Sequence, residues 1–270
     1  MSRFVAISTS DASLVRCELD RVRPQVELDA GDLVVGVGAY AETVVLQRSH
    51  GVGVPRTELW ETPESDSVIL AATRLGVGQS VEDSSQPFRF RQWLFAHVGM
   101  VDQGERVRER LIAQLPEFLG RSVHGATLSE AVFATYLSEL RTLGRLEDMT
   151  LEAPIAAQVL ARTARIVEQV SGEVGGTEKS HLAMVATNGR VLVAARRGNQ
   201  PLAYSLLEGE ATCGRHGLTA ASSEKEPLVR DHRRRKSVVL ATNPLRMDTW
   251  VAVPDGGAVA VDRRLQVQTL

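Results

Sequence analysis

The stretch that decides how the chain is interpreted is Gln86-Pro87-Phe88-Arg89-Phe90-Arg91-Gln92-Trp93-Leu94-Phe95-Ala96-His97-Val98-Gly99-Met100. Pro87 predicts a turn, the apolar run from Trp93 to Ala96 has the length of a β-strand, and Gly99 is expected to close that strand. Three of the six phenylalanines and one of the three tryptophans lie here, although aromatic residues make up only 4% of the chain. This concentration of large apolar side chains indicates a strand in the protein core.

The composition is that of an ordinary globular protein. The 270 residues are 43% hydrophobic and 24% charged, which is enough apolar material for a sizeable core. A net charge of −2 gives no general attraction to nucleic acid or to a membrane. No apolar run reaches the roughly 18 residues that a membrane span needs, and the N-terminus lacks the pattern of a signal peptide. We therefore expect a cytoplasmic protein with no membrane association, and a single domain over residues 1–270 because no repeat or low-complexity linker divides them.

Two features bear on metals and on nucleic acid. Cys17 and Cys213 are too few and too isolated in the sequence for a disulfide framework or a zinc site, so no metal is expected. The basic run 230–236 could contact phosphate or an acidic partner, but no aromatic residues lie between its charges for base stacking. We expect this run to be a solvated loop and expect no nucleic-acid partner.

The N-terminal part of the chain alternates predicted strands with predicted helices. Apolar and β-branched runs predict strands over 4–8, 32–40, 43–48, 67–74 and 92–97, the second and third forming a hairpin. The apolar spacing over 105–119 predicts a helix that Pro116 kinks or ends early. Thr127 and Glu130 have the spacing of a capping box, in which Glu130 reaches back to the cap, and Gly144 is expected to end the helix that follows.

The C-terminal part is predicted to be one helix followed by strands. A helix over 154–170 has a proline near its start and Gly172 beyond its end. Strands are predicted over 181–187, 190–196, 237–245 and 250–261. Asn188-Gly189 joins the first two of these strands and predicts a type I′ hairpin turn, which requires positive φ angles.

The opening stretch also resembles a known family. Pro87-Phe88, and then Trp93-Leu94-Phe95-Ala96-His97 followed after one residue by Gly99, are similar to the signature of class II glutamine amidotransferases, Pro-Phe and Trp-Leu-Phe-Ala-His-Asn-Gly. Further similarities extend from residue 2 to about 262, including Gly36-Val37-Gly38 in a glycine-bearing strand. The most similar subgroup comprises small stand-alone proteins, among them the hydrolase of ergothioneine synthesis. The resemblance implies an α+β fold, the four-layer αββα sandwich of N-terminal-nucleophile hydrolases with mainly antiparallel sheets, and neither metal nor cofactor.

The resemblance places the reacting groups at Ser2, Val98 and Gly99. In the family, a Cys at position 2 becomes N-terminal when Met1 is removed, and its free amine acts as the base for its own thiol. Here the residue is Ser2, whose hydroxyl is much harder to ionise than a thiol. The two residues after the family's His build the oxyanion hole, and they are Val98 and Gly99 in this chain. Val98 therefore stands where the family has an asparagine donor.

The resemblance also places the substrate-binding groups. Arg74 occupies the position whose guanidinium pairs with the α-carboxylate of glutamine. Leu128 occupies the position of an aspartate that binds the α-amino group, at the start of a helix. The neighbouring residues Thr127, Ser129 and Glu130, which match the family, are those that cap the helix.

Ser2, Val98 and Leu128 thus each replace a family residue with a different function, whereas the residues that support the fold are retained. Loss of one oxyanion donor typically lowers turnover by about 100- to 1000-fold. Leu128 leaves the ammonium group of glutamine without a charged partner. We therefore expect a pseudoenzyme that is inactive as a glutaminase and works by binding or assembly, with an unidentified protein partner or with itself. The alternative is an N-terminal serine amidohydrolase that uses Ser2 on an amide other than glutamine, and a weak glutaminase is the remaining possibility.

Overall fold

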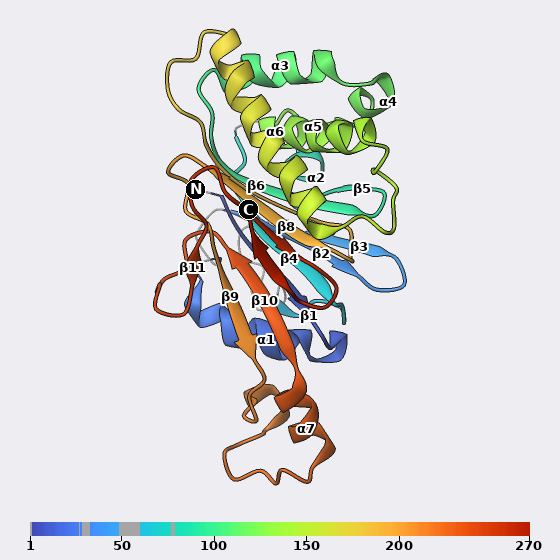
Figure 1. Ribbon diagram of the computed structural model, residues 1–270, viewed down its shortest axis with the longest axis vertical. Helices are drawn as coiled ribbons and strands as arrows, with labels where there is room; N and C mark the ends of the chain where they lie inside the picture. The colour runs from blue at the N-terminus through green and yellow to red at the C-terminus, as the bar shows by residue number, and fades with distance from the viewer. Residues whose placement is uncertain (1, 27, 29–32, 49–59, 77–78) are drawn as a thin grey trace.

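The computed structural model describes residues 2–26, 28, 33–48, 60–76 and 79–270, and these form two stacked β-sheets with helices outside them (Figure 1). The strands of the first sheet are β1 (Arg3–Thr9), β2 (Val34–Tyr40), β3 (Val44–Arg48), β4 (Ser67–Thr73), β9 (Ala203–Glu208), β10 (Lys236–Ala241) and β11 (Val251–Ala252). Those of the second are β5 (Phe88–Phe90), β6 (Trp93–Met100), β7 (His181–Thr187), β8 (Leu192–Arg197), β12 (Ala258–Val261) and β13 (Val267–Thr269).

The described strands follow the orders β11-β9-β10-β1-β4-β2-β3 and β13-β12-β8-β7-β6-β5, and the neighbours in both sheets pair antiparallel. The helices are α1 (Val15–Val22), α2 (Val81–Ser84), α3 (Gly104–Gln114), α4 (Glu117–Gly120), α5 (Leu128–Thr142), α6 (Ala153–Glu173) and α7 (Pro227–Arg234). Helices α5 and α6 pack on the second sheet, with α3 against them, whereas α1 covers the outer face of the first sheet. This confirms the predicted α+β sandwich of mainly antiparallel sheets. Of the helices described, none is long and apolar enough to cross a membrane.

Strand β6 lies inside the second sheet, and both of its faces are buried. Leu94, Ala96 and Val98 point into the apolar layer between the two sheets. Their neighbours point to the helices, where the ring of Phe95 stacks on that of Phe133 with 5.0 Å between centroids. A strand that is buried on both faces has a continuous apolar sequence, which explains the concentration of aromatic residues here.

The predicted strand 92–97 is correct in position but too short. Strand β6 continues to Met100, so Gly99 lies within it rather than closing it. The Pro87 segment also adds the short strand β5, in which Phe88 pairs with Phe95. A Cβ atom on Gly36 would lie 2.2 Å from the carbonyl oxygen of Gln86, so the glycine in β2 allows the segment before β5 to pass close to the first sheet.

One helix end is as predicted and another differs. Residues 105–119 divide into α3 and α4 at Pro116, as expected. The third helix, predicted over 154–170, runs on to Glu173 and includes Gly172. The backbone N–H of Gly176 donates to the carbonyl of Ser171, which is the hydrogen bond of a Schellman motif with Gly175 at the left-handed position.

The capping box at the start of α5 forms only in part. The hydroxyl of Thr127 accepts a hydrogen bond from the backbone N–H of Glu130, as predicted. Glu130 does not reach back to Thr127 but accepts hydrogen bonds from the backbone N–H groups of His124, at 3.0 Å, and Gly125, at 2.7 Å. The carboxylate therefore fixes the loop before the helix rather than the helix cap itself.

The Asn188-Gly189 turn and the basic run also differ from their predictions. The β7–β8 hairpin is present, but only Gly189 has positive φ, so the turn is not of type I′. Asn188 instead accepts hydrogen bonds from the backbone of the two residues after Gly189. Residues 230–236 are not a loop, because α7 extends to Arg234 and β10 begins at Lys236. The buried side chains of Val229 and His232, three residues apart, form the inner face of that helix.

The two cysteines are isolated in the sequence but not in space. Cys17 and Cys213 lie in one group with His216 and His232, and the ligand-type atoms of these four residues are all within 4.8 Å of one another. Antiparallel pairing of β9 with β10 and of β10 with β1 brings these distant segments to the same end of the first sheet.

Candidate functional site

A cavity of about 580 Å³ opens where β1, β4, β6 and β10 meet at one end of the two sheets. Four of the five site residues predicted from the sequence line it, namely Ser2, Arg74, Val98 and Gly99. They come from segments up to 97 residues apart, and sheet pairing brings them together. The volume falls within the range of about 300–1,000 Å³ that is typical of small-molecule sites.

Ser2 is held at the mouth of the cavity by strand β1. In β1, Arg3 pairs with Ala72 of β4, so the residue before the strand comes next to the end of β4. The hydroxyl oxygen of Ser2 accepts a hydrogen bond from the backbone N–H of Arg74 at 3.0 Å. The amine that would serve as a base requires removal of Met1, which lies outside the described residues.

The oxyanion-hole positions lie on β6, beside β7. Gly99 has φ +151°, and a Cβ atom there would lie 1.8 Å from the carbonyl oxygen of His181. Glycine is therefore required at this position by the close approach of the β7 backbone. The side chain of Val98 is only 3% exposed and belongs to the apolar layer between the sheets. This side chain lines the cavity with hydrocarbon and offers no hydrogen-bond donor.

His97, which precedes these two positions, is a fixed neutral group. It is buried, and Nδ1 lies 2.9 Å from the hydroxyl of Ser129 on α5. Burial lowers the pKa of His97 to about 4, so the imidazole is uncharged at neutral pH. The side chain of Gln86 hydrogen-bonds to both backbone groups of His97. It donates to the carbonyl at 2.9 Å and accepts from the N–H at 2.5 Å.

Leu128 is the exception among the predicted site residues, because it does not line this cavity. It begins α5 and packs against the apolar core under the helices. The adjacent residue Ser129 lines the cavity instead. The first turn of α5 is thus at the site, but the leucine side chain points to the helix layer.

Several polar residues of the cavity were not found from the sequence. His181, Asn199 and Asn243 line it, and Nδ1 of His181 accepts a hydrogen bond from the backbone N–H of Asn199 at 3.0 Å. Asn243 has φ +52° and follows β10, whose pairing with β1 carries it next to Ser2. An Asn-Pro pair directly after a strand was the local signal for this position.

The electrostatic character of the cavity rests on Arg74. Among the described residues that line it, Arg74 is the only one of the types Lys, Arg, Asp or Glu, and its side chain is exposed. A guanidinium group without a nearby carboxylate on the wall attracts carboxylate or phosphate groups. The described wall offers no carboxylate to pair with an ammonium group.

Solved structures with the same fold come from glutamine amidotransferase proteins. A class II glutamine aminotransferase domain protein from Silicibacter pomeroyi superposes with a TM-score of 0.61 at 18% identity, over 99% of this chain and 98% of that one. A predicted glutamine amidotransferase from Pseudomonas aeruginosa gives 0.55 at 17% identity, over 99% and 95%. The glutamine phosphoribosylpyrophosphate amidotransferase of B. subtilis gives 0.52 at 12% identity, over 99% of this chain and 48% of that one.

Sequence comparison adds no nearer relative, since no protein-family model and no curated protein matches the chain. The structural matches are below 25% identity and extend over nearly the whole chain in each case. They agree with the resemblance given by the Pro-Phe and Trp-Leu-Phe-Ala-His motifs. The chain has the fold of the class II glutamine amidotransferase domain proteins.

Proposed function

We propose that this protein keeps the class II amidotransferase fold as a binding module and does not hydrolyse glutamine. The observation that carries the proposal is the charge of the cavity wall, where Arg74 is the only charged group among the described residues. This arrangement favours a small ligand that carries a carboxylate and lacks an ammonium group. A partner protein that presents such a group, or a second copy of the chain, would use the same recognition.

Glutamine itself fits this wall poorly. Its α-carboxylate would have Arg74 as a partner, but its α-ammonium group would be desolvated without a carboxylate nearby. The developing negative charge of a tetrahedral intermediate would also lack a donor from the Val98 side chain, which typically costs about 100- to 1000-fold in turnover. Binding and chemistry are therefore both unfavourable for this substrate.

A second function is favoured by the position of Ser2. Its hydroxyl lies at a cavity whose wall includes the apolar side chains of Val98 and Met100. An N-terminal serine amidohydrolase acting on an amide with an apolar acyl group would use this arrangement, with the freed amine of Ser2 as the base. Cleavage of such amides that Ser2→Ala abolishes would favour this function over the binding module.

The binding proposal is tested with two probes that differ in one group. Glutaramate is glutamine without its α-amino group, so it keeps the carboxylate and loses the ammonium charge. By isothermal titration calorimetry we expect glutaramate to bind more tightly than glutamine, and Arg74→Ala to weaken it by about tenfold or more.

The matched control is Arg165→Ala, which removes an exposed arginine from α6, away from the cavity. It should leave glutaramate binding unchanged. Tighter binding of glutamine than of glutaramate, or equal effects of the two arginine variants, would contradict the proposal. Size-exclusion chromatography with light scattering separately tests the predicted self-association.

A further inference from the structure

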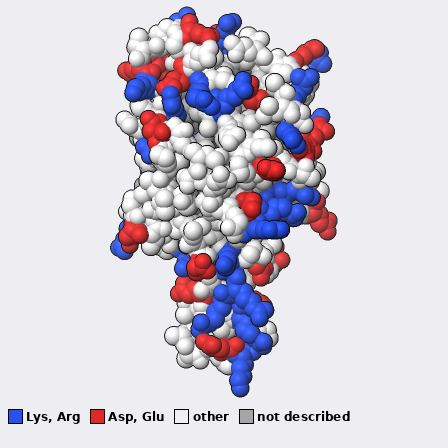
Figure 2. All heavy atoms as spheres, viewed as in Figure 1, with Lys and Arg blue, Asp and Glu red and all other residues white. Residues whose placement is uncertain are grey.

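The connection between β9 and β10 forms a lobe that projects beyond the end of the first sheet (Figure 1). This lobe, residues 209–235, contains the short 3-10 helix η4 (Gly214–His216) and α7, and Figure 2 shows lysine and arginine side chains gathered over it. Its buried apolar side chains among the described residues are Leu218 and Val229. So small an apolar core contributes little to the stability of the lobe, so other interactions must fix it in place.

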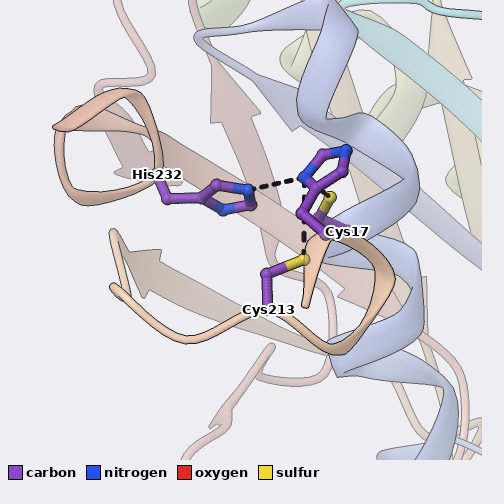
Figure 3. A group of neighbouring side chains, drawn as sticks. Cys17, Cys213 and His232 are labelled. Carbon is purple, nitrogen blue, oxygen red and sulfur yellow. Dashed lines mark hydrogen bonds between the residues drawn. The ribbon is translucent and has the colours of Figure 1, made fainter. Parts of the chain in front are cut away.

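Four side chains of metal-ligand type meet where the lobe joins α1. Cys17 comes from α1, Cys213 and His216 from a tight turn, and His232 from α7. Figure 3 shows Cys17, Cys213 and His232 directed toward one point from these separate segments.

The distances among these atoms are close to those of a tetrahedral zinc site. Nδ1 of His216 lies 3.6 Å from the sulfur of Cys17, 3.9 Å from the sulfur of Cys213 and 2.9 Å from Nε2 of His232. A tetrahedral Zn²⁺ with Zn–S of about 2.3 Å and Zn–N of about 2.0–2.1 Å sets its ligand atoms roughly 3.3–3.8 Å apart. The three distances from Nδ1 of His216 lie within about half an ångström of these values, and all four ligand atoms lie within 4.8 Å of one another.

The turn that carries two of these residues is built for close ligands. Cys213 and His216 are separated by two residues, and Cys213 exchanges two backbone hydrogen bonds with Leu218, at 2.9 and 3.0 Å. Zinc ligands two to four residues apart on such a turn are typical of structural sites. This pairing was missed from the sequence because the other two ligands lie far away in the chain.

We propose that Cys17, Cys213, His216 and His232 bind one Zn²⁺ ion, which fixes the 209–235 lobe to α1. Two thiolates and two imidazoles form the donor set that selects zinc, and four protein ligands leave no open position for catalysis. The role is therefore structural, because the ion joins segments that share few apolar contacts. This inference does not depend on the function proposed for the Ser2 cavity.

The groups around the cluster decide which nitrogen of His232 carries its proton. Nη1 of Arg235 donates to Nδ1 of His232 at 2.7 Å, so a neutral His232 carries its proton on Nε2, the atom that faces the cluster. To bind a metal ion through Nε2 as a neutral imidazole, His232 would move its proton to Nδ1, and the guanidinium would turn away from that nitrogen. Arg235 is itself paired with the buried carboxylate of Glu18. His216 is exposed, which gives an ion a route into the site from solution.

Metal content tests the proposal directly. The full chain is expressed in zinc-supplemented medium, purified without an affinity tag under reductant, and analysed by plasma mass spectrometry. We expect about one zinc per chain, and less than about a tenth of that in Cys17→Ser and in Cys213→Ser. His124→Gln, which replaces a histidine outside the cluster, is the matched control and should keep the full content.

Two further measurements use the wild-type chain, so they do not depend on the folding of a variant. Replacement of zinc by Co²⁺ should give a thiolate-to-cobalt charge-transfer band. Removal of the metal by a chelator should make trypsin cleave the lobe at exposed Lys225 about tenfold faster, and added zinc should restore the slower rate. A reduced wild-type chain with no metal and no cobalt band would overturn the proposal. A Cys17–Cys213 disulfide that persists under reductant, or full zinc content in both cysteine variants, would also overturn it.

Discussion

The hydroxyl of Ser2 accepts a hydrogen bond from the backbone N–H of Arg74, which lies 72 positions away in the sequence, at 3.0 Å. The bond exists because β1 and β4 are neighbours in the first sheet and run antiparallel. It places the residue expected to act as a nucleophile beside the residue expected to hold a carboxylate. The same cavity has the apolar Val98 where a donor would be needed for acyl chemistry.

The close approach at Gly99 predicts a large loss of stability when a side chain is added. In Gly99→Ala the new Cβ would lie 1.8 Å from the carbonyl oxygen of His181, so β6 and β7 must separate there. We expect the free energy of unfolding in urea to fall by about 3 kcal/mol. Gly172→Ala is the matched control, since that position lies within α6 with no atom within 4 Å of the added Cβ. It should raise stability by about 0.5–1 kcal/mol. Equal effects of the two variants would contradict the geometry at Gly99.

Glu130 is expected to stabilise the protein through the loop that precedes α5. Its two carboxylate oxygens accept hydrogen bonds from the N–H groups of His124 and Gly125. Glu130→Gln keeps the shape but turns an amide N–H₂ toward one of these donors, which should lower the free energy of unfolding by about 1–3 kcal/mol. Glu109→Gln, at an exposed position on α3, should change it by less than about 0.5 kcal/mol. If Glu130→Gln left the free energy of unfolding unchanged, the loop would not depend on these bonds.

His97 should make stability depend on pH. Its pKa in the folded protein is about 4, below its ordinary value of 6.5, so only the unfolded chain binds the proton between these values. The contribution is fully present above about pH 6.5 and is lost as pH falls toward about 4. From about pH 7 to about pH 5 we expect a loss of about 2 kcal/mol in the free energy of unfolding.

The His97→Gln variant isolates this contribution, because it removes the titrating group and leaves the carboxylates in place. The wild-type curve of unfolding free energy against pH should be steeper than that of the variant between about pH 7 and about pH 5. Parallel curves would contradict the assignment of a depressed pKa to His97.

Restoring the thiol alone is not expected to create a glutaminase. Ser2→Cys supplies the nucleophile, but Val98 still lacks a donor and the described wall still lacks a carboxylate for the ammonium group. Groups that act as one unit have strongly non-additive effects, so a single change should give no ammonia release above background. The comparison is with the double variant Ser2→Cys, Val98→Asn, which supplies both the nucleophile and the donor; Leu128→Asp is left out because that side chain packs in the helix layer and does not line the cavity. Substantial turnover by Ser2→Cys alone would show that the cavity already binds glutamine productively.

Much of the fold follows from local sequence patterns. The strands of both sheets appear as β-branched or apolar runs, and the motifs around Pro87 and Trp93 define β6, which is buried within the second sheet. Helix ends are less predictable, because the chain has glycines at both 172 and 175, and only Gly175 takes the left-handed conformation that follows the end of α6. The inner face of α7 was missed because its two buried residues are surrounded by basic ones.

The candidate site was predictable only where residues match a motif. Ser2, Arg74, Val98 and Gly99 were placed by resemblance, and the structure brings them to one cavity. Leu128 was placed by the same resemblance, yet its side chain packs among the helices, since the first turn of α5 presents Ser129 to the cavity. The cluster around Cys17 and His232 has the Cys213–His216 spacing as its only local signal, because the other two ligands join them only through the pairing of distant strands.

Ammonia release from glutamine by the purified wild-type chain decides whether the protein hydrolyses glutamine. The intact mass of the same sample establishes whether Met1 is retained or Ser2 is N-terminal. We predict a rate no higher than that of Ser2→Ala in either case, because the Val98 wall and the missing carboxylate do not depend on the N-terminus. Clear turnover by the wild type that Ser2→Ala abolishes would contradict the account and would establish Ser2 as the nucleophile of an active amidohydrolase.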